Sequence, residues 1–265
     1  MQFKSKPSNR TPIQRIVWGT SMGLSVLFIV NDPALADEPV LAPKAGLTYT
    51  LATTVTTNGE LVSTNAGLVS SEHVTTITSK RKVLNSDGIS HTVQVTSTDM
   101  NSTDPNIKAA KNSSPENTST YRYFLMTENI STQRNAQTAP GKTEDVTQKY
   151  NWECDKASLQ SFFPLGHIPR VSVQCTMTIL GNGASRLSRP TTYVLSYEGK
   201  SNIDLPSGKF TVQNVRATTT LSNNTTEDAL YLIDEKTGLT VSSETIRKNG
   251  NVQTSLVKSN VTEIR

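Results

Sequence analysis

The feature that most constrains the fold is a strict alternation of apolar and polar residues from Val171 to Ile179. The apolar members are Val171, Val173, Cys175, Met177 and Ile179, and Ser172, Gln174, Thr176 and Thr178 stand between them. Successive side chains of a strand point to opposite faces of a sheet, so the pattern predicts a half-buried antiparallel strand with Cys175 turned to the core. No comparable helical periodicity runs through residues 37–265, and threonine, which suits the solvent face of a sheet, is the commonest residue.

Similar alternating runs recur along the chain, and short polar connectors separate them. The runs lie at 47–55, 89–95, 193–197, 230–232, 239–241 and 252–261, and the connectors at 85–88, 181–183, 222–226, 235–238 and 248–251. Connectors rich in Gly, Asn or Asp between such runs are typical of successive hairpins. The sequence therefore predicts an all-β fold, a single antiparallel meander that forms a curved sheet, half-barrel or barrel.

One short helix is expected near 156–163. Asp155 can cap the amides at its start, and Leu159, Phe162 and Phe163 form one apolar stripe at helical spacing. Pro164 then ends it.

The first 36 residues have the pattern of a cleaved signal peptide. A basic segment up to Arg15 precedes an uncharged, mostly apolar run at 16–30, and Ala34-Leu35-Ala36 supplies a cleavage site before Asp37. The apolar run is shorter than the roughly 20 residues that span a bilayer, so we expect no membrane span after cleavage. An uncleaved N-terminal anchor is the alternative. The expected location is periplasmic or secreted.

After the leader we expect an extended lead at 37–45 and a single β domain at 46–265. Two stretches, 99–120 and 134–148, hold few large apolar side chains, and we expect them to be long polar loops of this domain. Removing the leader lowers the net charge from +4 to about +1. Because the longest basic run is only Lys80-Arg81-Lys82, nucleic acid is not an expected partner.

The two cysteines, Cys154 and Cys175, both follow the leader. In an oxidising compartment an isolated pair is most simply a disulfide. A free thiol pair and half of a metal site are the alternatives, although a zinc site needs further ligands and the chain has three scattered histidines.

Three segments of the second half resemble an uncharacterised family of secreted, periplasmic Gram-negative β proteins. They are Trp152-Glu153-Cys154-Asp155 with Leu159 and Phe163-Pro164-Leu165-Gly166, then Leu205-Pro206-Ser207-Gly208-Lys209-Phe210, and last Tyr231 with Thr237-Gly238-Leu239-Thr240-Val241. The resemblance covers roughly residues 150–250, with Ser207 where the family has Ala and Leu230-Tyr231-Leu232-Ile233 in place of an aromatic strand. It implies a curved antiparallel sheet or half-barrel in the periplasm and no catalytic residue.

No motif indicates a catalytic, cofactor or metal site. The one G-x-S-x-G match, at 19–23, lies in the leader, and no phosphate-binding, dinucleotide-binding or metal-ligand spacing occurs. His91 lies on the apolar face of its run, where a core role is expected rather than metal ligation. We therefore expect no enzyme activity and no cofactor.

Tyr193, Leu195 and Tyr197 lie on one face of a predicted strand, where they pack in the core or line a cavity of the curved sheet. The leading hypothesis is a non-enzymatic envelope domain that binds a lipid or other apolar ligand. The alternative is a structural or protein-interaction component of the envelope, whose interior is filled. A hydrolase with an unrecognised site is the third hypothesis.

Overall fold

The computed structural model describes residues 42–64, 67–104, 110–113, 116–139, 142–163, 165, 167–181, 187–221 and 225–265. The chain divides into two compact units, Met1–Glu38 and Pro39–Arg265, and all described residues belong to the second. The expected signal peptide at 1–36 lies outside the described residues and stays a prediction.

The described residues form thirteen strands and one short helix. These are β1 (Thr48–Thr64), β2 (Gly67–Ser86), β3 (Ser90–Ser102), β4 (Ala110–Ser113), β5 (Glu116–Arg122), β6 (Leu125–Ala139), β7 (Lys142–Cys154), α1 (Lys156–Phe162), β8 (Arg170–Gly181), β9 (Leu187–Leu205), β10 (Gly208–Thr220), β11 (Thr225–Asp234), β12 (Thr240–Asn249) and β13 (Val252–Ile264).

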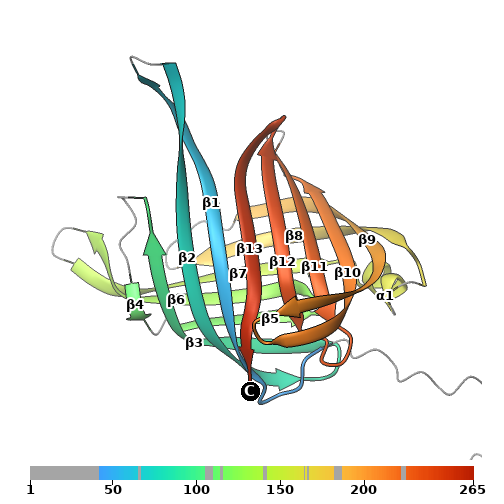
Figure 1. Cartoon of the computed structure of the whole chain (residues 1–265). Helices are drawn as coiled ribbons and strands as arrows, with labels where there is room; N and C mark the ends of the chain where they lie inside the picture. The colour runs from blue at the N-terminus through green and yellow to red at the C-terminus, as the bar shows by residue number, and fades with distance from the viewer. Residues whose placement is uncertain are drawn as a thin grey trace, which may run out of the picture. The chain divides into compact units, whose positions relative to one another are not determined.

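Twelve of the thirteen described strands close into an antiparallel barrel. Each of them pairs with its neighbours in chain order, β4 adds only to the edge of β3, and β13 returns to pair with β1. In Figure 1, β1, β2 and β10–β13 lie in front and cross β5–β9 behind them at a steep angle. The predicted all-β meander is confirmed, and closure leaves each of the twelve strands paired on both sides.

The strand predicted from the alternation at 171–179 is β8. Val173 and Cys175 are buried and Ser172 and Gln174 are exposed, as the alternation predicts, whereas Thr178 on the predicted polar face is buried. Among the connectors that the structure describes in full, 235–238 forms a turn between β11 and β12, and Asp87, between β2 and β3, accepts hydrogen bonds at Oδ1 from the amides of Ile89 and Ser90 at 2.9 and 2.5 Å. Short polar connectors therefore set the register of the hairpins.

The prediction of loops at 99–120 and 134–148 is wrong over most of both ranges. The structure has β5 and the ends of β3, β6 and β7 there. The inward faces of these strands carry polar side chains: Asn129 Nδ2 donates to Asn117 Oδ1 at 2.8 Å and to Ser119 Oγ at 2.9 Å. Because hydrogen bonds replace apolar contacts on this face, the sequence shows no apolar alternation, and the neighbouring strands stabilise the segment instead.

The expected lead at 37–45 is described only from Ala42 onward. Ala42 and Pro43 are buried, and the amide of Gly46 donates to the carbonyl of Val83 at 2.9 Å. This end of the lead therefore packs against the barrel.

The helix forms where it is predicted. Asp155 accepts hydrogen bonds from the amides of Ala157 at 3.3 Å and Ser158 at 3.1 Å, which caps the first turn. Leu159 and Phe162 are buried in a core cluster, and Phe163, the next residue, packs against it. Pro164, the predicted stop, lies outside the described residues.

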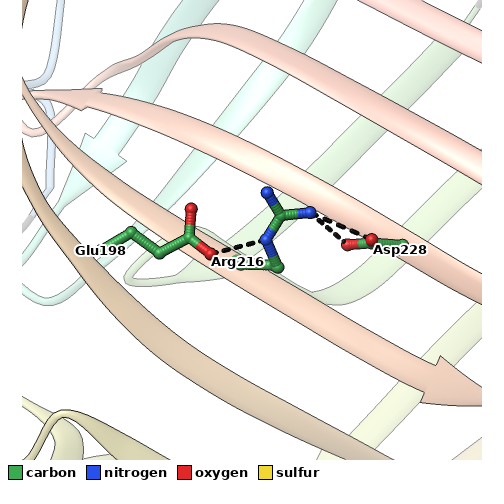
Figure 2. A network of polar contacts seen from close by, with 3 residues as sticks. All are labelled: Glu198, Arg216 and Asp228. Carbon is green, nitrogen blue, oxygen red and sulfur yellow. Dashed lines mark hydrogen bonds and ion pairs between the residues drawn. The ribbon is translucent and has the colours of Figure 1, made fainter.

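The outer face of the barrel carries a three-residue ionic network across β9, β10 and β11 (Figure 2). Arg216 Nε donates to Glu198 Oε1 at 2.6 Å, and one of its terminal nitrogens donates to both carboxylate oxygens of Asp228 at 3.0 Å.

Replacing Arg216 with methionine is expected to lower the free energy of unfolding by no more than about 1 kcal/mol. The side chains of Arg216, Glu198 and Asp228 are 39%, 38% and 41% exposed, so water screens the network. Urea unfolding of the wild type and the variant measures the change. A loss of about 3 kcal/mol or more, as for a buried pair, would contradict this interpretation.

Candidate functional site

A continuous row of inward-facing residues runs across five strands of the barrel. Thr53 on β1 lies opposite Ser259 on β13, Ser259 opposite Ser243 on β12, and Ser243 opposite Tyr231 on β11. Tyr231 in turn lies opposite Val215 on β10, which is fully buried. Directly opposed residues of an antiparallel pair share one face, so the ladder itself brings these side chains together inside the barrel.

This row borders a cavity of about 330 Å³. Its apolar and aromatic lining consists of Tyr49, Leu51, Tyr121, Phe124, Tyr231 and Leu239, and its polar lining of Arg81, His91, Thr53, Thr240, Ser242, Ser243 and Ser259. The volume lies at the lower end of the roughly 300–1,000 Å³ of small-molecule sites. A mainly apolar wall with a few polar groups is the usual composition of such a site.

Phe124 belongs both to the core cluster around α1 and to the cavity lining. It belongs to the turn between β5 and β6, and its ring lies 5.0 Å from that of Tyr231 and 6.1 Å from that of Phe163. The preceding residue, Tyr123, has a φ of 57° and stacks on Phe163 at 3.6 Å. A bulky residue rarely adopts this conformation, and its burial against Phe163 holds the turn that places Phe124.

Arg81 supplies a positive charge at the cavity wall. It is half-buried on β2, opposite Tyr49 on β1, and its Nε donates to Ser79 Oγ at 3.1 Å. Burial raises the pKa of Tyr49 to about 12, partly offset by the charge of Arg81 and a hydrogen bond from it. Tyr49 and Tyr231, whose pKa burial also raises, are therefore neutral hydroxyls at physiological pH.

His91 is the second ionisable group beside the aromatic wall. It is 7% exposed, and its ring stacks on that of Tyr121 at 5.1 Å. Within the described part of the chain, its buried Nδ1 has no hydrogen-bond partner. Burial lowers the pKa of His91 to about 4, and the charge of Asp87 opposes this effect only in part. The imidazole is therefore neutral at pH 7.

The low pKa of His91 predicts a loss of stability in mild acid. The unfolded chain takes up this proton near pH 6.5 and the folded chain only near pH 4, so stability falls as the pH falls through that window. The groups around His91 are Asp87 in the turn, Tyr121 on β5 and Arg81 on the same cavity wall. We expect about 2 kcal/mol less unfolding free energy at pH 5 than at pH 7.5 from this group alone.

Urea unfolding at pH 5.0 and 7.5 checks this expectation. His91→Gln cannot take up the proton. Its unfolding free energy should therefore fall by about 2 kcal/mol less than that of the wild type between pH 7.5 and pH 5.0. Equal pH dependence of the two proteins would contradict it.

The structure places Tyr193, Leu195 and Tyr197 on β9, next to α1. Leu195 is fully buried and the two tyrosines are half-buried, and all three belong to or pack against the core cluster that holds Leu159 and Phe162. The cavity described above is lined by other residues. Sequence reasoning missed Arg81, Tyr121 and Tyr231 as site residues, and it interpreted His91 as a core group.

Cys154 at the end of β7 and Cys175 on β8 form a disulfide and are directly opposed in the ladder. Among the described residues there is no cluster of His, Cys, Asp and Glu that could hold a metal ion. The same residues contain no helix that is long and apolar enough to cross a membrane.

No protein-family model matches the chain, and no curated protein matches it either. The predicted family resemblance therefore stays a prediction. Solved structures with some similarity include a hypothetical lipoprotein, YmcC, from Escherichia coli K12, at 8% identity and a TM-score of 0.40, covering 81% of this chain and 84% of that chain.

Two further structures cover 86% of this chain and 99% of their own. One is a protein from Bacteroides fragilis with a YmcC-like fold, provisionally described as exported, at 9% identity and a TM-score of 0.38. The other is a protein from Parabacteroides distasonis, provisionally described as a lipoprotein, at 13% identity and a TM-score of 0.34. Likenesses this distant do not indicate what this chain binds.

Proposed function

We propose that this chain is a non-enzymatic binding domain of the bacterial envelope and that it holds a lipid-like or other apolar ligand inside its barrel. The observation that carries the proposal is the cavity of about 330 Å³ with its aromatic and aliphatic wall. A structural or interaction protein needs no such space, because its interior can be filled by side chains. The cavity therefore favours a binding function over a purely structural one.

Two observations support a location outside the cytoplasm. The leader pattern at 1–36 is that of an exported chain. The disulfide between Cys154 and Cys175 belongs to an oxidising compartment such as the periplasm.

A non-enzymatic function is supported by the chemistry of the wall. Its described lining has no carboxylate and no cysteine, and its ionisable groups besides tyrosines are Arg81 and His91. The wall does hold serine hydroxyls beside His91, but the buried Nδ1 of His91 has no hydrogen-bond partner among the described residues, so it is not paired with a serine nucleophile.

Titration with N-phenyl-1-naphthylamine, a neutral fluorescent probe of apolar sites, tests the proposal. The wild type should enhance the probe's fluorescence saturably at one site per chain. Ser243→Trp, which fills the cavity, should weaken this binding about tenfold or more. Thr226→Trp, at an exposed position on β11, is the matched control and should bind like the wild type.

Thermal unfolding of both variants establishes that they are folded. Absence of saturable binding by the wild type would refute the proposal. Wild-type affinity in a folded Ser243→Trp would also refute it, because the probe would then lie elsewhere.

A further inference from the structure

The cavity wall combines an apolar surface with a positive charge that has no acidic counterpart. Arg81 is permanently charged and forms none of the ion pairs found among the described residues, and Glu263, which lines a second pocket with Arg81, pairs with Arg265 instead. Arg216, Arg247 and Arg265 differ in this respect, since each forms an ion pair with a glutamate. Its hydrogen bonds to Ser79 and Tyr49 occupy only part of the five N–H donors of the guanidinium, so Arg81 retains further donor capacity.

His91 adds an unsatisfied polar atom to the same wall. His91 is only 7% exposed, and its buried Nδ1 has no hydrogen-bond partner among the described residues. Buried polar atoms in folded proteins are nearly always paired, so an unpaired Nδ1 calls for an explanation, such as a ligand, ion or water that contacts it. A neutral imidazole can donate one hydrogen bond and accept another, so His91 can contact a polar ligand group at neutral pH.

The rest of the polar lining is made of hydroxyl groups. Five serines and threonines contribute, and none of the described lining residues is an aspartate or glutamate. Some of these hydroxyls are already engaged: Thr53 and Ser259 bond each other at 2.9 Å, and Ser242 donates to Asn260 at 2.8 Å. One guanidinium with hydroxyl donors and no acid is a favourable environment for an anion.

Phe124, Tyr231 and Leu239 line the same cavity as Arg81 and His91. A ligand that satisfies both parts of the wall has an apolar body and an anionic end. A guanidinium can form two parallel hydrogen bonds with a carboxylate or with a phosphate. These are therefore the two head groups to compare.

We propose that the cavity binds an amphiphile with an anionic head group, a carboxylate or a phosphate monoester, whose head contacts Arg81 and His91 and whose alkyl part contacts Phe124, Tyr231 and Leu239. This inference rests on the proposed binding function and specifies the chemical class of its ligand.

Isothermal titration calorimetry at pH 8 with decanoate, decyl phosphate and decanol tests the inference. The three probes share one alkyl chain and differ in head group. We expect the wild type to bind at least one of the two anionic probes about tenfold or more tightly than decanol. Whichever anion binds more tightly identifies the head group, carboxylate or phosphate.

Arg81→Met should reduce that preference to about threefold or less, because it removes the charge and keeps most of the apolar stem, so the affinity for the anion should fall further than the affinity for decanol. Arg216→Met is the matched control: it changes the net charge equally, on the outer face, and should retain the wild-type preference. If Arg81→Met does not fold, the comparison of the three probes on the wild type still decides the question.

Equal affinity of the wild type for all three probes would contradict the proposal of an anionic head group and leave the proposed binding function intact. No binding of any probe would overturn both. An equal loss of decanol and anion affinity in folded Arg81→Met would also overturn the inference, since Arg81 would then shape the cavity without recognising charge.

Discussion

Replacing Phe162 with alanine is expected to lower the free energy of unfolding by about 4 kcal/mol. Phe162 is fully buried, and its ring meets that of Phe163 edge-on at 5.3 Å. The substitution removes a large apolar side chain from a core cluster and leaves a cavity that the surrounding strands, fixed by ladder hydrogen bonds, cannot easily fill. Urea unfolding monitored by tryptophan fluorescence measures the loss.

Gln160→Ala is the matched control within the same helix. Gln160 is exposed, so its replacement should change the free energy of unfolding by less than about 0.5 kcal/mol. A loss of less than about 1 kcal/mol in Phe162→Ala would show that α1 does not pack on the barrel as described.

Removing the disulfide is the second change with a large expected effect. Cys154→Ala with Cys175→Ala should lower the free energy of unfolding by about 3 kcal/mol, because the crosslink closes a loop whose ends are 21 residues apart. The crosslink restricts the unfolded chain, whereas the ladder pairing of β7 with β8 remains in the folded one. Urea unfolding of the oxidised wild type and the double variant gives the difference.

Two controls accompany this measurement. Unfolding the wild type in the presence of reductant should give a stability close to that of the double variant. The intact mass after alkylation without reductant should show no added label on the wild type. Two labels, or equal stability of oxidised wild type and double variant, would contradict the structural role of the disulfide.

Local patterns were sufficient to predict β8 and α1. The alternation at 171–179 and the spacing of Leu159 and Phe162 after the Asp155 cap depend only on neighbouring residues. The pairing of Cys154 with Cys175 agrees with the favoured interpretation of an isolated cysteine pair in an exported chain.

The same local reasoning failed where the inward face is polar. On β5 and β6, the side-chain amide of Asn129 donates hydrogen bonds to Asn117 and Ser119. The inward-facing residues there are polar, so the sequence shows no alternation of apolar and polar residues. Closure of the barrel likewise depends on the pairing of β1 with β13, at opposite ends of the domain. The sequence left open whether the sheet closes, because no local pattern specifies which distant strands pair.

The cavity is also a product of distant pairing. The run at 47–55 was recognised as a strand, but nothing in it indicates that Thr53 lies opposite Ser259 or that Tyr49 lies beside Arg81. His91 was placed correctly on a buried face, yet its lack of a partner for Nδ1 appears only in three dimensions.

The most direct test of a ligand-binding barrel is the native mass of the protein itself. The full chain is produced with its own leader in a Gram-negative host and purified without detergent. The proposed function predicts a population that carries the mass of one bound amphiphile per chain, which is lost when the protein is unfolded in acid and organic solvent. A mass equal to that of the bare polypeptide throughout, from a preparation that also fails to bind the apolar probe, would contradict it.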